Sequence, residues 1–155
     1  MDERPILILG LGNVLMCDDG AGVHALRDFA PPGNRSAVLR DGGTLGLTLL
    51  PEVEACSALI VFDAAVMGAS PGEVRSFVGA DMDAQLSGRK TSVHELALAD
   101  LLDAADLLGA KPERRALIGV QPEHIGWGLE PTEKIAAALP AMWVAACEII
   151  GSWTP

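Results

Sequence analysis

The chain has few cysteines, and they are far apart. The three, Cys17, Cys56 and Cys147, include no Cys-x-x-Cys pair in 155 residues. This number and spacing exclude a disulfide framework or a cysteine-rich zinc cluster and are typical of reduced thiols in a cytosolic protein. Cys17 lies in a loop near the start of the chain. It could act as a nucleophile or a metal ligand, or it could fill apolar space as a small side chain.

Positive charge and long apolar runs are also scarce. The chain has 11 Lys and Arg against 21 Asp and Glu, for a net charge of −10 and a pI near 4.6. This excludes a basic footprint for nucleic acid and leaves open a cation, a basic protein partner or plain solubility. No apolar run reaches the roughly 18 residues that span a bilayer. The first residues are acidic where a signal peptide would be basic, so we expect a cytoplasmic protein without a membrane partner.

Several common catalytic motifs are missing. Gly10-Leu11-Gly12 begins a dinucleotide-binding fingerprint, but Leu15 stands at the place of its third glycine. There is no Gly-Lys-Ser/Thr phosphate loop and no Gly-x-Ser-x-Gly elbow. A zinc-protease helix would need a second histidine four residues after His94, where Leu98 stands.

What the chain does have is apolar sequence in short runs. Hydrophobic residues make up 50% of it and the mean hydropathy is +0.32, which predicts one folded domain over residues 1–155. The pattern predicts strands at 5–10, 36–40, 58–62, 73–78 and 115–120, and helices at 19–30, 45–55, 93–108 and 131–150. Residues 80–92 connect the fourth strand back across the sheet. The helix at 93–108 is expected to be capped by Thr91 or Ser92 and to bury Leu96, Leu98, Leu101, Leu102 and Leu107.

The spacing of these elements predicts an α/β fold, a three-layer αβα sandwich around a five-stranded, mostly parallel sheet. Only about ten residues separate Asp63 from the fourth strand, too few for a crossover helix. That strand should therefore be the one antiparallel strand of the sheet.

Carboxylates follow the first three strands. Asp18 and Asp19 come after the first, Asp41 after the second and Asp63 after the third. Parallel strands end at one edge of a sheet, where α/β proteins hold ligands. The helix from residue 93 must begin at the same edge to lead into the fifth strand, which brings His94 to the carboxylates.

Two carboxylates and an imidazole, Asp19, Asp63 and His94, can form a divalent-metal site with open positions, suited to zinc, nickel or manganese. Each residue also has a plainer interpretation. Asp19 can be a helix cap, Asp63 a turn former after a strand, and His94 a surface residue in a first helical turn. His24 and His124 are expected to be structural or peripheral.

Asp18 is the less certain of the two adjacent carboxylates. Asp18 or Asp19 is placed to cap the helix predicted to begin at residue 19. Of the two, we expect Asp18 to be the cap rather than a ligand.

Seven short motifs in unbroken order, between residues 6 and about 126, give the chain a family resemblance. They are Gly10–Asn13, Asp18–Gly22, Asp41–Thr44, Phe62–Ala64, Pro71–Glu73, Ser92–Leu96 and Gly119–Glu123. With these motifs the chain resembles the hydrogenase maturation proteases. These endopeptidases remove a C-terminal extension from the large subunit of nickel–iron hydrogenases. The region after Pro131 is similar only in being helical.

The resemblance implies an aspartyl-type endopeptidase whose metal-binding and catalytic residues are Asp19, Asp63 and His94. The implied substrate cleft is lined by Gly12, Asn13, Asp41, Gly42, Gly43 and Thr44. The implied partner is a hydrogenase large-subunit precursor, and the protease is expected to be a monomer. In the family the nickel is already in the precursor, so nickel would be supplied by the substrate. Zinc or cadmium could occupy the same site in vitro.

Two other functions stay open at this point. The first is a non-catalytic nickel-binding escort or chaperone for the same precursor. The second is a peptidyl-tRNA hydrolase-like enzyme, prompted by Gly10–Asn13. Val14 stands where that family has proline, and the net charge of −10 is unsuited to tRNA. The resemblance also leaves open whether the metal activates water, polarises the carbonyl or only gates recognition, or whether a carboxylate acts as general base.

Overall fold

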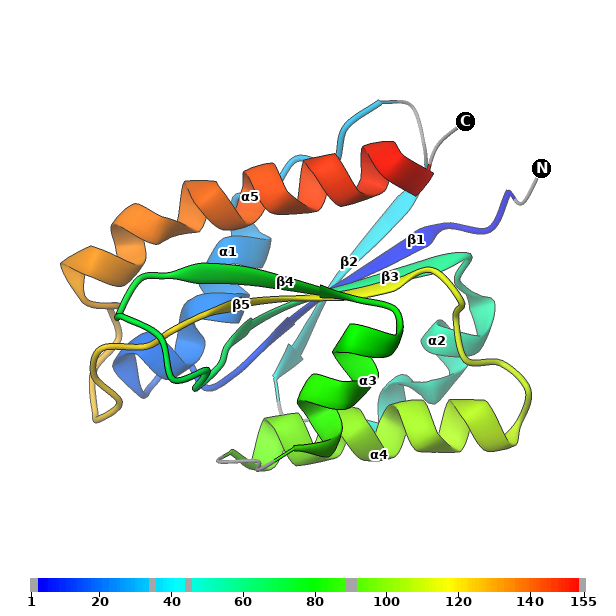
Figure 1. The fold of residues 1–155 in the computed structure, drawn as a ribbon, viewed down its shortest axis with the longest axis horizontal. Coiled ribbons are helices and arrows are strands. Elements are labelled where there is room, and N and C mark those ends of the chain that lie inside the picture. The colour runs from blue at the N-terminus through cyan, green and yellow to red at the C-terminus, as the bar shows by residue number, and fades with distance from the viewer. Residues whose placement is uncertain (1–2, 34–35, 44–45, 89–91, 154–155) are drawn as a thin grey trace.

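A computed structural model describes residues 3–33, 36–43, 46–88 and 92–153. The strands are β1 (Ile6–Leu11), β2 (Ala37–Gly43), β3 (Ala58–Ala64), β4 (Val74–Val78) and β5 (Arg115–Val120). The helices are α1 (Ala21–Arg27), α2 (Leu50–Ala55), α3 (Ala80–Ser87), α4 (Val93–Leu107) and α5 (Glu133–Trp153), with short 3₁₀ helices η1 (Cys17–Gly20) and η2 (Gly46–Leu49). The sheet lies between α1 and α5 on one face and α2, α3 and α4 on the other (Figure 1).

The sheet has the strand order β2-β1-β3-β5-β4. Its first three pairings are parallel, and β4 runs antiparallel to β5, which confirms the predicted architecture. Along β1, Ile6 and Ile8 enter the core under α1 and α5, while Leu7 and Leu9 enter the core on the other face. Both faces of β1 are buried because helices cover both, as in other parallel sheets.

Two predictions about helices are wrong. Residues 80–87 form helix α3, where the sequence predicted only a connection. In α4, Leu96 is half exposed and Leu107 is 89% exposed, so neither belongs to the buried face. The predicted cap of α4 is confirmed for Ser92, whose hydroxyl accepts a 3.3 Å hydrogen bond from the Glu95 N–H. Thr91, the alternative cap, lies outside the described residues.

Helix α5 is long and apolar enough to cross a membrane by length and composition, with a mean hydropathy of 1.6. One side of this helix nevertheless packs on the sheet. Ile135, Leu139, Met142 and Ile150 lie in the core with β1 and β3, and the indole of Trp143 donates a 2.8 Å hydrogen bond to the Ala25 carbonyl. In this fold α5 lies on the sheet through one apolar side, and 22% of its apolar window is buried inside the protein.

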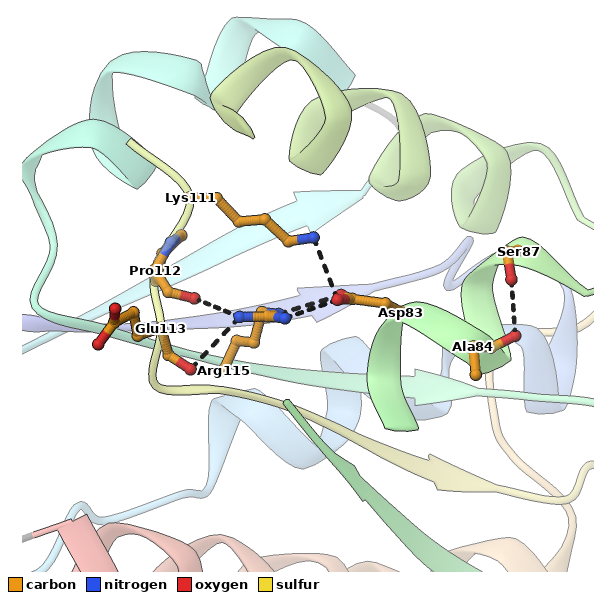
Figure 2. Close-up of polar contacts among 7 residues, drawn as sticks. All are labelled: Asp83, Ala84, Ser87, Lys111, Pro112, Glu113 and Arg115. Atoms are coloured by element: carbon orange, nitrogen blue, oxygen red, sulfur yellow. Dashed lines mark hydrogen bonds and ion pairs between the residues drawn. The ribbon is translucent and has the colours of Figure 1, made fainter. Parts of the chain in front are cut away.

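A cluster of charges joins α3 to the start of β5 (Figure 2). Arg115 binds the Asp83 carboxylate through two nitrogens, at 3.0 and 2.6 Å, and donates to the carbonyls of Pro112 and Glu113. Lys111 lies 3.1 Å from the same carboxylate. These contacts lie at the amino end of β5, opposite the sheet edge where the predicted site residues lie.

Candidate active site

The loop after β1 is folded tightly onto the backbone of Asp19. Gly12 has φ of 120°, and a Cβ there would lie 1.9 Å from the Asp19 carbonyl oxygen, so only glycine fits. The Asn13 N–H donates a 3.0 Å hydrogen bond to Oδ2 of Asp19. The Asn13 side chain in turn accepts a bond from the Leu15 N–H. The loop thus fixes both the backbone and the carboxylate of Asp19.

A second close approach brings α1 against the carboxyl ends of two strands. A Cβ on Gly22 would lie 2.3 Å from the Phe62 carbonyl oxygen and 2.5 Å from that of Leu11. This contact places the chain around Asp19 beside the end of β3, which carries Asp63. The glycines of this stretch therefore allow backbone segments to pack closely.

The structure brings Asp19, Asp63 and His94 together from three separate elements. Asp19 lies in η1, Asp63 near the end of β3 and His94 in the first turn of α4. Nε2 of His94 is 3.0 Å from Oδ1 of Asp19, and its Nδ1 is 3.2 Å from Oδ1 of Asp63. The imidazole therefore lies between the two carboxylates, with one nitrogen toward each.

The three side chains differ in exposure. Asp63 is fully buried, His94 is 5% exposed, and the Asp19 side chain is 13% exposed. Asp19 is thus the most accessible member of the group.

The electrostatics favour a cationic histidine. Burial lowers the pKa of His94, but its contacts with Asp19 and Asp63 and their negative charges outweigh burial and raise that pKa to about 10. Burial raises the pKa of Asp19, but hydrogen bonds from His94 and the Asn13 N–H bring it below its ordinary value. For Asp63 burial dominates, and its pKa is raised despite the adjacent histidine.

Glu95, the residue after His94, was not among the residues predicted for the site. Burial, and then the charge of Asp63, raise its pKa to about 7. Its burial follows from the direction in which the first turn of α4 faces, and no sequence motif carries that information. Glu95 adds another acidic group to this edge of the sheet.

The donor set suits a divalent cation. Both oxygens of Asp63 and Nδ1 of His94 are buried without an aligned hydrogen-bond partner, so the 3.2 Å contact between them pairs charges only. A buried carboxylate in this state has capacity for a cation. Among the described residues, however, no three His, Cys, Asp or Glu side chains are already arranged around one point. Binding by all three requires the imidazole to move from its place between the carboxylates.

The predicted cleft residues on β2 lie at the same edge of the sheet. Asp41 pairs with Gly10 and Gly43 with Leu11 in the β1–β2 register. The Asp41 side chain is exposed, and none of the contacts in the described part of the chain joins it to Asp19, Asp63 or His94. Thr44, the last predicted cleft residue, lies outside the described residues.

Asp18 has a role that the sequence analysis missed. The N-cap of α1 is Gly20, without a side-chain cap bond, so the prediction that Asp18 or Asp19 caps this helix is wrong. Asp18 is instead fully buried and accepts four hydrogen bonds from the segment after β5. Its partners are the backbone N–H groups of Glu123, His124 and Thr132 and the Thr132 hydroxyl. The chain separation of more than 100 residues explains why no local pattern indicated this contact.

The remaining predicted side chains lie beside the group or away from it. Cys17 has a left-handed φ of 50° and packs its sulfur against Gly128. His124 contacts Asp18 through its backbone. The His124 N–H donates to Oδ2 of Asp18, and the His124 carbonyl accepts from the Asp18 N–H. His24 lies on α1 with a buried Nε2 that has no hydrogen-bond partner. Burial, followed by the charge of Arg27, lowers the pKa of His24. Within the part of the chain that the structure describes, no hydrogen bond or ion pair joins these side chains to Asp19, Asp63 or His94.

Comparison with known protein families gives one consistent result. A family model described as hydrogenase maturation protease matches residues 23–149. The hydrogenase expression/formation protein HupD of Bradyrhizobium diazoefficiens is 35% identical over 156 residues, which cover 97% of this chain and 80% of that protein. The hydrogenase 2 maturation protease of Escherichia coli is 34% identical over 164 residues, which cover 91% of this chain and 94% of that protein.

Solved structures extend the likeness to the fold. The hydrogenase maturating endopeptidase HybD from Escherichia coli matches with a TM-score of 0.86 and 29% identity, over 96% of this chain and 93% of that one. The [NiFe] hydrogenase maturation protease HybD from Thermococcus kodakarensis matches with a TM-score of 0.79 and 28% identity, over 94% of this chain and 98% of that one. The sheet and its helices are therefore shared with these structures along nearly the whole chain.

Proposed function

The chain belongs to the hydrogenase maturation protease family, and from this premise we propose that it removes the C-terminal extension of a nickel-loaded hydrogenase large-subunit precursor. The observation that carries the proposal is the contact of His94 with both Asp19 and Asp63 at the carboxyl edge of the sheet. The three residues come together in a fold that closely matches two solved maturation proteases.

We assign the three side chains different roles according to how deeply each is buried. Asp63, fully buried beside Nδ1, positions the imidazole. Asp19 and Nε2 of His94 form the part of the group that faces the substrate, because the Asp19 side chain is the most exposed. Holding the scissile peptide against this pair would supply much of the rate enhancement through positioning.

Nickel enters this proposal as part of the substrate. Asp19 and Asp63 offer anionic oxygens and His94 offers a nitrogen once it has released its proton, a set that suits nickel and also zinc or cadmium. A divalent ion held there would supply Lewis-acid chemistry to the carbonyl or to water. We further propose that the protein works in the cytoplasm, in line with its free, widely spaced cysteines, and that it does so as a monomer.

The test uses purified protein with nickel-loaded and nickel-free precursor, and mass spectrometry of the released peptide. We expect trimming of the nickel-loaded precursor alone. If neither form is trimmed, the endopeptidase function is wrong. Nickel-dependent binding without cleavage would indicate the escort role instead.

Variants test the assignment of residues. His94→Ala and Asp63→Asn should abolish trimming while keeping the circular dichroism of the wild type. The matched control is Asp100→Asn, an exposed carboxylate on α4, which should trim at the wild-type rate. Wild-type activity in both site variants would overturn the assignment.

A further inference from the structure

Four large apolar side chains are exposed on two segments that lie side by side next to η1. Trp127 is 84% exposed and Leu129 67%, while Leu15 and Ile125 are about half exposed. We call these four residues the apolar rim. Large exposed apolar groups gathered in one place are costly to solvate and mark interaction surfaces on soluble proteins. Tryptophan is also one of the residue types, with tyrosine and arginine, that are enriched among the residues that dominate binding energy.

The apolar rim is held rigidly. The Gly128 N–H donates a 2.9 Å hydrogen bond to the Leu15 carbonyl, and the Cys17 N–H donates a 2.9 Å bond to the Gly128 carbonyl. Met16 and Gly128 form a parallel β-bridge. The four bonds to Asp18 fix the rest of the segment. A surface ordered in this way loses little conformational entropy when a partner binds.

The apolar rim is continuous with the candidate active site. Asp18, which binds the segment on one side, is followed directly by Asp19, whose Oδ1 lies 3.0 Å from Nε2 of His94. The loop that carries Leu15 also holds the Asp19 carboxylate, because the Asn13 N–H donates to Oδ2 of Asp19 and the Asn13 side chain accepts from the Leu15 N–H. The apolar rim therefore borders the chain around Asp19. An apolar segment of a polypeptide is the chemistry the rim can recognise, because Trp127, Leu129, Leu15 and Ile125 offer apolar area and no charge.

We propose that the apolar rim docks an apolar segment of the precursor polypeptide next to the bond that is cleaved, with Trp127 as the main anchor. This inference rests on the proposed function, because it takes the processed precursor as the occupant. The rim thereby contributes to substrate affinity and selection, and the chemical step is left to the residues at the sheet edge.

Steady-state kinetics on the nickel-loaded precursor provide the first test. Trp127→Ala should raise KM about tenfold or more and leave kcat within about twofold, because it removes binding area and no reacting group. Trp127→Phe should recover most of the loss. The matched control is Leu107→Ala, which truncates an equally exposed residue at the far end of α4 and should not change KM.

A binding measurement separates this inference from the proposed function. The Kd of uncleaved precursor is measured by titration calorimetry in the His94→Ala background, with and without Trp127→Ala. If the wild type cleaves and Trp127→Ala leaves both KM and Kd unchanged, the docking inference is overturned and the function stands. If the wild type does not cleave but Trp127→Ala weakens Kd about tenfold, the docking surface stands and the endopeptidase function fails.

Sedimentation velocity distinguishes a precursor from a second copy as the occupant. A wild-type dimer that Trp127→Ala dissociates, together with an unchanged KM, would make the apolar rim a self-association contact and overturn the proposal. A monomer in both proteins, together with the raised KM, supports it.

Discussion

Replacing Asp18 with asparagine should destabilise the fold strongly, although the two side chains have the same shape. Oδ2 of Asp18 accepts bonds from the N–H groups of Glu123 and His124 at 2.9 Å and from the Thr132 hydroxyl at 3.0 Å. Oδ1 accepts the Thr132 N–H at 2.6 Å. An asparagine has one carbonyl oxygen, so its NH₂ must face at least one of these donors.

The expected loss in the free energy of unfolding follows from these four hydrogen bonds. Bonds to a charged group contribute roughly 1.5–3 kcal/mol each and neutral bonds about 1, while a buried donor left unsatisfied costs about 1–3 kcal/mol. When the carbonyl oxygen of the asparagine takes the place of Oδ2, it keeps three bonds, now weaker because the acceptor is neutral. The NH₂ group then faces the Thr132 N–H, which is left without an acceptor. We therefore expect a decrease of about 3 kcal/mol or more in the free energy of unfolding. For a chain of this length, that corresponds to a fall in Tm of about 6–12 °C.

Urea unfolding followed by circular dichroism measures this loss, with Asp100→Asn as the matched control. Asp100 is exposed on α4, so its variant should stay within about 0.5 kcal/mol of wild type. Hydrogen exchange should also speed up at the backbone amides of Glu123, His124 and Thr132. A loss below about 1 kcal/mol, with exchange unchanged at these amides, would refute the role given to Asp18.

Three further predictions test other contacts. Burial lowers the pKa of His94, but its carboxylate neighbours raise it to about 10 overall. The stability that protonated His94 contributes is therefore complete below about pH 6.5 and lost as pH rises toward 10. The wild-type free energy of unfolding should fall by about 2 kcal/mol from pH 7 to 8.5, and His94→Gln should flatten this slope; an unchanged slope would contradict the assignment. Gly12→Ala, whose Cβ would lie 1.9 Å from a carbonyl oxygen, should lower stability by about 3 kcal/mol in thermal melts. Gly151→Ala is the control, because open space surrounds Gly151, and it should not lower stability. Equal melting temperatures for the two variants would argue against the close packing of Gly12 on Asp19. Arg115→Met should cost about 1 kcal/mol at pH 7 by removing the bidentate bond to Asp83. Because that bond lowers the pKa of Asp83, the cost should shrink as pH falls below about 4, and a cost independent of pH would contradict the ion pair.

The central strands β1, β3 and β5 were predictable because each is a short, largely apolar run between turn signals. The direction of β4 followed from the number of residues between it and β3, which leaves no room for a crossover. Helix α3 was not predictable in the same way, because only Met82 and Leu86 of it are buried. One apolar pair in a helix of eight residues gives too weak a period to separate it from a loop.

The helix α4 shows the limit of counting apolar residues. Leu96 and Leu107 are exposed although they belong to a leucine-rich helix, because composition does not show which side of a helix faces the sheet. The end of an apolar run was also a poor guide to the position of Asp63. The apolar run ends at Phe62, but β3 continues past Asp63, which pairs with Gly119 of β5. A residue expected at the start of a loop is therefore a fully buried strand residue.

The convergence of Asp19, Asp63 and His94 on one edge follows from topology alone. Their contact distances do not, since they depend on the close approach of Gly22 to Phe62 and Leu11 and on the helix turn that carries His94. A sequence pattern gives the edge of the sheet on which a residue lies. It cannot show that the imidazole occupies the space between the carboxylates.

The adjacent carboxylates Asp18 and Asp19 have different roles because they lie in a 3₁₀ turn. In η1 successive side chains point about 120° apart, so Asp18 faces the segment after β5 while Asp19 faces His94. One turn thus fixes both the segment that carries the apolar rim and the carboxylate of the candidate active site. Activity lost in Asp18→Asn can therefore arise by two routes, which kinetics separates. A raised KM with unchanged kcat means that the rim has moved, whereas a lowered kcat means that Asp19 has moved with its neighbour.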